Sequence, residues 1–298
     1  MVRNRKQSRT ADLVAGIIVV LVALGLLLAV LFAVDQWREH LAEAQQPTTT
    51  APISTPAPTK PPAPTLMTNP FASDDFAYDT NGYMGCLTAE YLLGVDVSEY
   101  QKKINWEKVA SSGVDFAMVR LGYRGWGAEG VLREDARGLD NLRGAKEAGL
   151  LVGVYFFSQA ITVEEAVEEA RFVLDLLNGQ SLDLPIVFDW ETVSSQDART
   201  ANMKRSTLNA CAQAFCREIE AAGYQPMVYF NLDMSRWMFD LLALQEAGCD
   251  FWLAMYSDSL TYRYGVRMWQ YTDSGKVSGI DGRVDMNLYF PELSRREE

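Results

Sequence analysis

Two carboxylates separated by one residue, at the end of the apolar run IVFDWE, are the side chains of this sequence best arranged for chemistry. Side chains alternate along a strand, so Asp189 and Glu191 point to one face, about 6.5 to 7 Å apart along the backbone, and Trp190 faces the other way. Carboxylates this close raise one another's pKa, and burial raises it further. One of them can then stay protonated near neutral pH while its partner stays ionised. That is the requirement for a general acid with a charge-stabilising neighbour.

Two more acids belong to apolar runs that read as strands. Asp96 follows LLGV near the start of the predicted domain, and Asp285 lies in VDMNLYF near its end. In a barrel of alternating strands and helices, functional side chains gather at one rim, so we expect these acids to meet. The alternative is structural: one acid of the DWE motif caps a helix or pairs with Arg120 or Lys204.

Short apolar runs alternate with amphipathic stretches from residue 91 onward. The predicted strands are 92–98, 115–123, 150–158, 184–191, 225–231, 250–256, 267–272 and 284–290. The predicted helices are 104–113, 140–149, 163–177 and 206–223. Helices separate several of the first five strands, which predicts an α/β fold: a modified (β/α), or TIM-like, barrel whose last strands are joined by loops.

The first 34 residues have the pattern of a membrane anchor. Residues 1–12 carry four basic side chains, and residues 13–34 contain no charge. A helix over 13–34 spans about 33 Å, which matches a hydrocarbon core of roughly 30 Å. The basic cluster predicts a cytoplasmic tail at 1–12 and places everything after the span outside the cell. A cleaved signal peptide is the alternative, although its apolar core usually runs about 7 to 15 residues.

A segment rich in proline and threonine follows the predicted anchor. Seven prolines and six threonines occupy the 19 residues 47–65, which predicts an extended spacer. Residues 35–89 are expected to form an extracellular linker, with 66–89 either continuing it or strapping onto the domain. The globular domain is predicted at 90–298.

Composition excludes several classes of function. The net charge of −12 argues against a broad nucleic-acid or anionic-lipid interface. Four cysteines without a CxxC pair and a single histidine, His40, argue against zinc sites and a Ser-His-Asp triad. We therefore expect no metal and no cofactor. Cys211 and Cys216, five residues apart on a predicted helix, suit buried apolar positions at least as well as a disulfide.

Four ordered sequence blocks carry a family resemblance. GVDVSEYQKKINWEKVASSGVDFAMVRLGY, GLLVGVYFF, LPIVFDWE and MWQYTDSGKVSGIDGRVDMNLY, with the spacing between them, resemble glycoside hydrolase family 25 lysozymes from about Gly94 to Phe290. The resemblance implies a modified (β/α) barrel that cleaves the β-1,4 bond between N-acetylmuramic acid and N-acetylglucosamine. Its expected partners are peptidoglycan glycan strands and, through residues 13–34, the membrane. A monomeric catalytic domain facing the cell wall is expected.

The resemblance also implies roles for individual acids. Glu191 matches the general acid, and Asp189 is similar to the carboxylate that orients the substrate's 2-acetamido group. Asp96 and Asp285 match two further acids of the cleft floor. The acetamide oxygen could attack the anomeric carbon, or Asp96 or Asp285 could activate water in an inverting route. The sequence leaves both routes open.

Four other residues are predicted to contact substrate: Tyr123, Tyr155, Phe157 and Gln270. Tyr155 aligns with a cleft tyrosine of the family, and aromatic rings near strand ends, including the YRGWG loop, can stack on sugars. Gln270 is either a hydrogen-bonding partner for substrate or an ordinary polar group of a strand interior. The family often has histidine where this sequence has Phe156, which puts one neighbouring contact in doubt.

Two other classes of function stay open at this stage. A non-catalytic module that binds the cell wall could use the same fold. A metal-dependent barrel enzyme could use the four acids as oxygen ligands for Mg or Ca.

Overall fold

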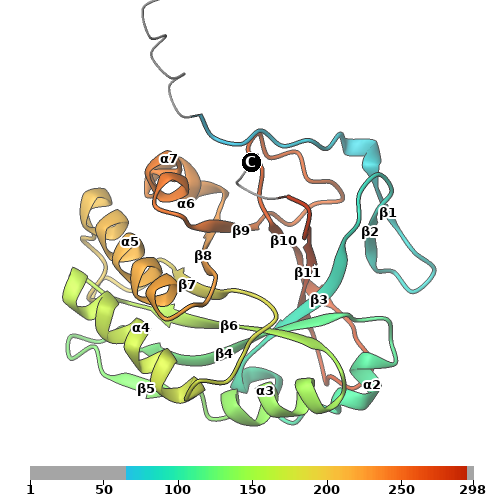
Figure 1. The fold of residues 1–298 in the computed structure, drawn as a ribbon, viewed down its shortest axis with the longest axis horizontal. Helices are drawn as coiled ribbons and strands as arrows, with labels where there is room; N and C mark the ends of the chain where they lie inside the picture. The colour runs from blue at the N-terminus through green and yellow to red at the C-terminus, as the bar shows by residue number, and fades with distance from the viewer. Residues whose placement is uncertain (1–64, 294–298) are drawn as a thin grey trace, which may run out of the picture. The chain divides into compact units, whose positions relative to one another are not determined.

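The computed structural model describes residues 65–293 of the chain, and eight of its strands close into a barrel (Figure 1). These are β3 (Leu92–Val97), β4 (Phe116–Arg124), β6 (Leu151–Ser158), β7 (Ile186–Trp190), β8 (Pro226–Asn231), β9 (Asp250–Ala254), β10 (Met268–Gly275) and β11 (Val284–Tyr289). Because β3 pairs with both β4 and β11, the sheet has no gap between its first and last barrel strands. All eight predicted strands are confirmed. A short β5 (Leu132–Glu134) extends the sheet from β4.

The last strand departs from a regular barrel. Neighbouring strands from β3 through β10 run parallel, but β11 runs antiparallel to both β10 and β3. The beginning of β11 therefore lies at the rim where the other strands end. Asp285, the second residue of β11, is paired in register with Asp96 of β3.

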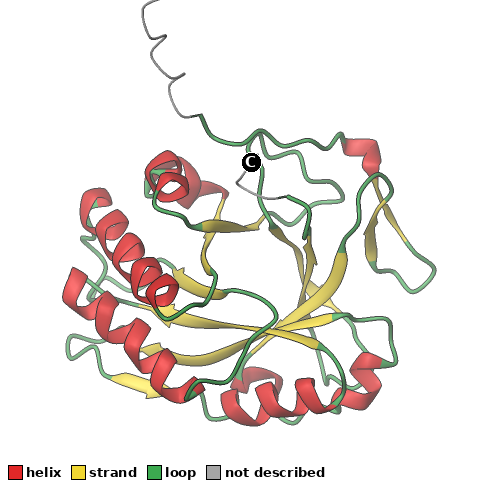
Figure 2. Cartoon of the chain, viewed as in Figure 1, coloured by secondary structure: helices red, strands yellow, loops and turns green. Residues whose placement is uncertain are grey.

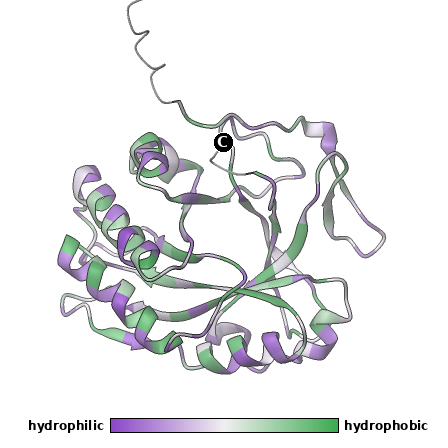
Figure 3. Cartoon of the chain, in the orientation of Figure 1, coloured by the Kyte–Doolittle hydropathy of each residue, from purple (hydrophilic) through white to green (hydrophobic). Residues whose placement is uncertain are grey.

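Helices surround the barrel on the side of the early strands (Figure 2). They are α2 (Trp106–Ala110), α3 (Gly138–Glu147), α4 (Val163–Leu177), α5 (Arg205–Ala221), α6 (Leu232–Trp237) and α7 (Leu241–Glu246). The four predicted helices are confirmed. Hydrophobic and hydrophilic residues alternate along α4 and α5, as expected of helices with one face on a core (Figure 3). Cys211 and Cys216 are buried on α5, as small apolar residues would be.

Two apolar layers result from the alternation of side chains along the strands. One lies between the sheet and its helices, and the other fills the barrel with residues such as Phe116, Val187 and Met227. Gly94 is required inside, because a Cβ there would lie 2.3 Å from the Phe116 ring. This interior packing supports the polar residues that point inward at the rim.

A strap formed by residues 65–89 packs on the side of the barrel that has no crossover helices. It contains η1 (Ser73–Asp75), β1 (Phe76–Tyr78) and β2 (Met84–Cys86). On this side of the barrel, no helix lies between β9 and β10 or between β10 and β11. The Phe76 ring lies 5.1 Å from Trp269, and Phe71 lies 4.7 Å from Phe290. The packed domain therefore begins upstream of the boundary expected at residue 90.

The predicted tail at 1–12, the predicted span at 13–34 and the linker up to residue 64 lie outside the described residues. Within 65–293, no helix has both the length and the apolar character needed to cross a membrane.

The strap should be needed for stability. Phe76→Ala is expected to lower the free energy of unfolding by about 3 kcal/mol, because it leaves a cavity over Trp269. Leu87→Ala, in the same segment but 68% exposed, is the matched control. Urea unfolding measures both, and equal midpoints for the two variants would contradict the structural role of the strap. For the same reason, a chain that begins at residue 90 should unfold at a lower temperature than one that begins at residue 65.

Candidate active site

A cleft of about 800 Å³ opens at the rim where the parallel strands end. It is lined by every side chain that the sequence predicted for the site: Asp96, Asp189, Glu191, Asp285, Tyr123, Tyr155, Phe157 and Gln270. The first four, referred to below as the acidic cluster, come from three strands, with Glu191 directly after β7. The barrel therefore brings together residues up to 189 positions apart in the sequence, and Asp285 lies at this rim because β11 runs antiparallel.

Alternation along β7 determines which of its side chains reach the cleft. Val187 belongs to the barrel interior, and Asp189, two residues later, points to the same side at the rim. Trp190 points outward and is fully buried, as the spacing predicted. Both acids line the cleft, but Asp189 is only 5% exposed, whereas Glu191 is half-buried.

Asp96 is held at the centre of a buried hydrogen-bond network. Its Oδ2 accepts from Gln270 Nε2 at 2.9 Å and from Asn287 Nδ2 at 2.8 Å. The Asn287 amide is oriented in turn by Trp252, whose Nε1 donates to Asn287 Oδ1 at 2.8 Å. Each partner is buried, so the position of this carboxylate is fixed before any ligand arrives.

The nitrogen and the oxygen of the Gln270 side-chain amide both form hydrogen bonds within the protein. Its nitrogen donates to Asp96, and its Oε1 accepts from the hydroxyls of Tyr229 and Tyr256, both at 3.1 Å. Gln270 lines the cleft as predicted, but these contacts favour a positioning role over a direct contact with substrate. Tyr256 is 55% exposed and extends the network to the cleft surface.

Asp96 and Asp285 share a proton across the β3–β11 pair. Burial raises the pKa of Asp285 to about 8, and the charge of Asp96 and the hydrogen bond to it act in the same direction. Burial also raises the pKa of Asp96 to about 6, although hydrogen bonds from Asn287 and Gln270 oppose the rise. Asp285 is therefore the protonated member that donates to Asp96.

The pKa of both acids of the DWE motif is raised. For Asp189 the causes are burial, then the charges of Glu191 and Asp96, while Arg120 opposes the rise. For Glu191 the causes are burial and the charge of Asp96. Burial and the repulsion between neighbouring carboxylates, the two causes named from the sequence, therefore both raise the pKa values of this pair. The Oδ1 atom of Asp189 is buried and has no hydrogen-bond partner within residues 65–293, so it is available to accept from a ligand.

Arg120 forms one side of the cleft. Its Nε donates to Asp135 Oδ2 at 2.7 Å and its Nη2 to Glu99 Oε1 at 3.2 Å. Its guanidinium lies 5.1 Å from the Tyr100 ring centre and 5.2 Å from that of Tyr123. Arg120 therefore forms its ion pairs with acids outside the DWE motif. From the sequence it was considered only as a partner for one of the two acids of that motif.

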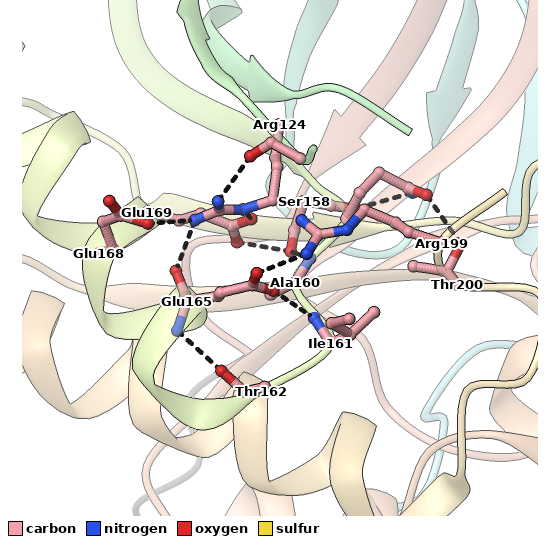
Figure 4. Close-up of polar contacts among 12 residues, drawn as sticks. Arg124, Ser158, Ala160, Ile161, Thr162, Glu165, Glu168, Glu169, Arg199 and Thr200 are labelled. Atoms are coloured by element: carbon pink, nitrogen blue, oxygen red, sulfur yellow. Dashed lines mark hydrogen bonds and ion pairs between the residues drawn. The ribbon is translucent and has the colours of Figure 1, made fainter. Parts of the chain in front are cut away.

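A β-bulge in β4 decides which way the next side chains point. The pairing with β6 shifts register between Arg120 and Gly122, which reverses the alternation beyond that point. Tyr123 consequently faces the cleft. Arg124 reaches toward α4, where its Nε donates to Glu169 Oε1 at 2.7 Å (Figure 4).

The aromatic residues of β6 divide between the two layers. Tyr155 and Phe157 line the cleft, and Tyr155 contacts Trp252 edge to face at 6.0 Å. Phe156 points outward and packs on Phe172 at 6.1 Å. Phe156, which stands where the family often has histidine, therefore lies in the outer apolar layer and does not line the cleft.

Sequence reasoning missed two residues that hold the acidic cluster in place, Tyr229 and Asn287. Both follow the same alternation as residues that were identified: Tyr229 is two positions after the interior Met227, and Asn287 is two after Asp285. Applying the strand period to every strand would have found them. Within the described chain, no group of three or more His, Cys, Asp or Glu side chains is arranged to hold a metal ion.

Comparison with known proteins identifies the family. The model of glycosyl hydrolases family 25 matches residues 95–280. YegX of Escherichia coli K12 is 27% identical over 216 residues, which cover 68% of this chain and 71% of YegX. Lysozyme M1 of Streptomyces globisporus is 27% identical over 215 residues, which cover 68% of this chain and 69% of that enzyme.

A solved structure agrees with this match. The modular autolysin LytC of Streptococcus pneumoniae, in complex with a synthetic peptidoglycan ligand, superposes with a TM-score of 0.59 at 25% identity. The superposition covers 76% of this chain and 52% of LytC, so the chain spans about half the length of that relative. Because the family model extends over more than half of the sequence and the barrel carries its cleft at the expected rim, the chain belongs to glycosyl hydrolases family 25 and is a glycoside hydrolase.

Proposed function

We propose that this protein is a peptidoglycan lysozyme that hydrolyses the β-1,4 bond between N-acetylmuramic acid and N-acetylglucosamine. The observation that carries the proposal is the convergence of Asp96, Asp189, Glu191 and Asp285 on one cleft in a family 25 barrel. The lysozymes among its relatives, and the peptidoglycan ligand bound to LytC, support the substrate class.

Glu191 is the proposed general acid. Burial and the charge of Asp96 raise its pKa, which keeps a proton on it at higher pH than an exposed glutamate would allow. It lines the cleft and is more exposed than Asp189, so the oxygen of a departing sugar can approach it. Glu191 would transfer its proton to that oxygen as the bond to the anomeric carbon breaks, so the departing sugar leaves as a neutral alcohol.

Asp189 is the proposed partner of the substrate's acetamide group. Its unpaired Oδ1 can accept a hydrogen bond from the acetamide N–H, which directs the acetamide oxygen toward the anomeric carbon. Arg120 opposes the rise in the pKa of Asp189 that burial and the charges of Glu191 and Asp96 cause. Asp96 is held by two amides and by Asp285, an arrangement that suits electrostatic stabilisation better than activation of a mobile water.

The proposed location is the outer face of the cell membrane. Residues 13–34 would anchor the chain, and the segment 47–65 would hold the enzyme roughly 60 Å from the bilayer if it adopts the polyproline II rise of about 3.1 Å per residue. The catalytic domain would then act on wall close to the membrane.

Replacing the general acid should abolish activity without unfolding the protein. Glu191→Gln is expected to lower kcat by about 100- to 10,000-fold, measured as release of reducing ends from purified peptidoglycan. Glu220→Gln, an exposed glutamate on α5, is the matched control and should behave as wild type. Sedimentation with insoluble wall but no release of reducing ends by the wild-type protein would instead favour the non-catalytic module.

The stereochemistry of the product tests the acetamide mechanism. Attack by the acetamide oxygen followed by attack of water inverts the anomeric carbon twice, so the first product should retain its configuration. Proton NMR of the anomeric signal during hydrolysis distinguishes the two products. Net inversion would exclude the acetamide route and would favour water activation by Asp96 or Asp285.

The Asp96–Asp285 pair should make stability depend on pH. The pKa of Asp285 rises from its ordinary value of 3.8 to about 8 on folding, so the stability from its protonated form is complete below 3.8 and is lost as pH rises through about 8. Asp285→Asn keeps a hydrogen-bond donor but cannot ionise. Relative to this variant, the wild-type Tm should fall between about pH 4 and pH 8. A Tm difference that is independent of pH would contradict the raised pKa.

A further inference from the structure

We propose that Trp126 forms a binding site for a sugar ring of the glycan strand, on a loop that hydrogen bonds connect to the backbone of Glu191. The inference depends on the proposed function for the identity of the ligand. The acids of the cleft act on a single bond. Trp126 would add a contact that makes activity depend on the length of the glycan strand.

Trp126 is exposed in a way that suits a ligand. It lies in the loop between β4 and β5, lines the same cleft as the acidic cluster, and is 50% exposed. Exposing an indole to water forgoes apolar burial, so a tryptophan in a cleft is commonly covered by a ligand. One face of a pyranose ring carries only C–H groups, and an indole plane matches that face.

The loop that carries Trp126 is fixed by its own hydrogen bonds. Gly125 N donates to Val131 O at 3.0 Å, and Gly130 N donates to Gly127 O at 3.0 Å. Arg124 Nη1 donates to Gly130 O at 2.7 Å from beneath. The loop is therefore ordered before binding, which lowers the entropic cost of holding a sugar.

A buried charge cluster anchors the loop to the barrel (Figure 4). Arg124 pairs with Glu169 at 2.7 Å and with Glu168 at 2.8 Å, and both glutamates belong to α4. Ser158, the last residue of β6, donates to the second oxygen of Glu169 at 2.6 Å. Because Arg124 and Glu169 are buried, removing either one would leave the other charge uncompensated, and the cluster resists movement.

A chain of hydrogen bonds connects the Trp126 loop with the proposed general acid. Gln159 Nε2 donates to Glu191 O at 2.9 Å, and Gln159 Oε1 accepts from Thr200 at 2.8 Å. The next residue back, Arg199, donates its backbone N–H to Trp126 O at 2.9 Å. Arg199 is itself anchored by an ion pair with Glu165 at the start of α4. These bonds fix the position of the Trp126 loop relative to Glu191. A sugar ring bound to Trp126 would therefore stay at a fixed distance from the bond that Glu191 protonates.

The test is the dependence of kcat/KM on glycan length. Wild type, Trp126→Ala and Trp126→Phe are compared in the full-length chain on peptidoglycan glycan oligomers of two and of four disaccharide units. Trp126→Ala should lower kcat/KM on the longer oligomer by about tenfold, with a smaller loss on the shorter one, because the longer strand can contact the indole in more of its binding positions along the cleft. Trp126→Phe should recover part of the loss, since it keeps a flat ring.

Trp237→Ala is the matched control. Trp237 lies on α6, is 73% exposed and is outside the cleft, so its removal tests the loss of an exposed indole in itself. It should leave the dependence on length as in wild type. Equal losses from Trp126→Ala on both oligomers, or the same change in the Trp237→Ala variant, would overturn the proposal.

A binding measurement separates this inference from the proposed function. Calorimetric titration of the four-unit oligomer into Glu191→Gln, with and without Trp126→Ala, reports binding without turnover. About tenfold weaker binding in the double variant supports the Trp126 site, and equal affinity overturns it. If the wild-type enzyme cleaves none of the oligomers although Glu191→Gln binds them, the proposed hydrolysis fails and the binding site stands.

Discussion

Four carboxylates clustered at one end of a barrel impose the main physical constraint on this protein. Ionised carboxylates this close repel one another and lose hydration on burial, so the cluster is stable only if protons are shared and the remaining charge is compensated. Asp285 keeps a proton that it donates to Asp96, and two amides hold the Asp96 carboxylate. Arg120 reduces the cost of charge at Asp189. The raised pKa of Glu191 has the same origin, burial and the charge of Asp96.

The direction of β11 makes this arrangement possible. Asp285 is near the beginning of its strand, and a parallel strand would place it at the opposite end of the barrel from Asp96. The antiparallel pairing of β11 with β3 brings the two residues into register. It also lets β10 connect to β11 without a crossover, and because no helix lies between β9 and β10 either, the outer face of the last strands is left without a helix. The strap provides that cover, with Phe71 and Phe76 against Phe290 and Trp269.

The side of the cleft formed by β4, β6 and the loop after β7 is organised by buried charge. Arg124 and Glu169 lie between the strands and α4, and the loops on either side hydrogen-bond to each other through Arg199 and Trp126. The bulge at Arg120 is the origin of this division, because it sends Tyr123 into the cleft and Arg124 out to the helix. Ligand contact and loop anchoring thus come from adjacent residues of one strand.

The sequence by itself determined the eight strands, the four long amphipathic elements and the orientation of Asp189, Glu191 and Trp190, because hydrophobic period and strand alternation are local properties. The expectation that functional side chains gather at one barrel rim added Asp96 and Asp285 to the same site, and the family resemblance implied roles for the four acids. Tertiary structure alone decided the antiparallel course of β11, the bulge in β4, the packing of residues 65–89 on the barrel and the use of Gln270 to hold Asp96. Each of these depends on pairing between segments distant in the sequence, and the energy of such pairing is not contained in the pattern of either segment alone.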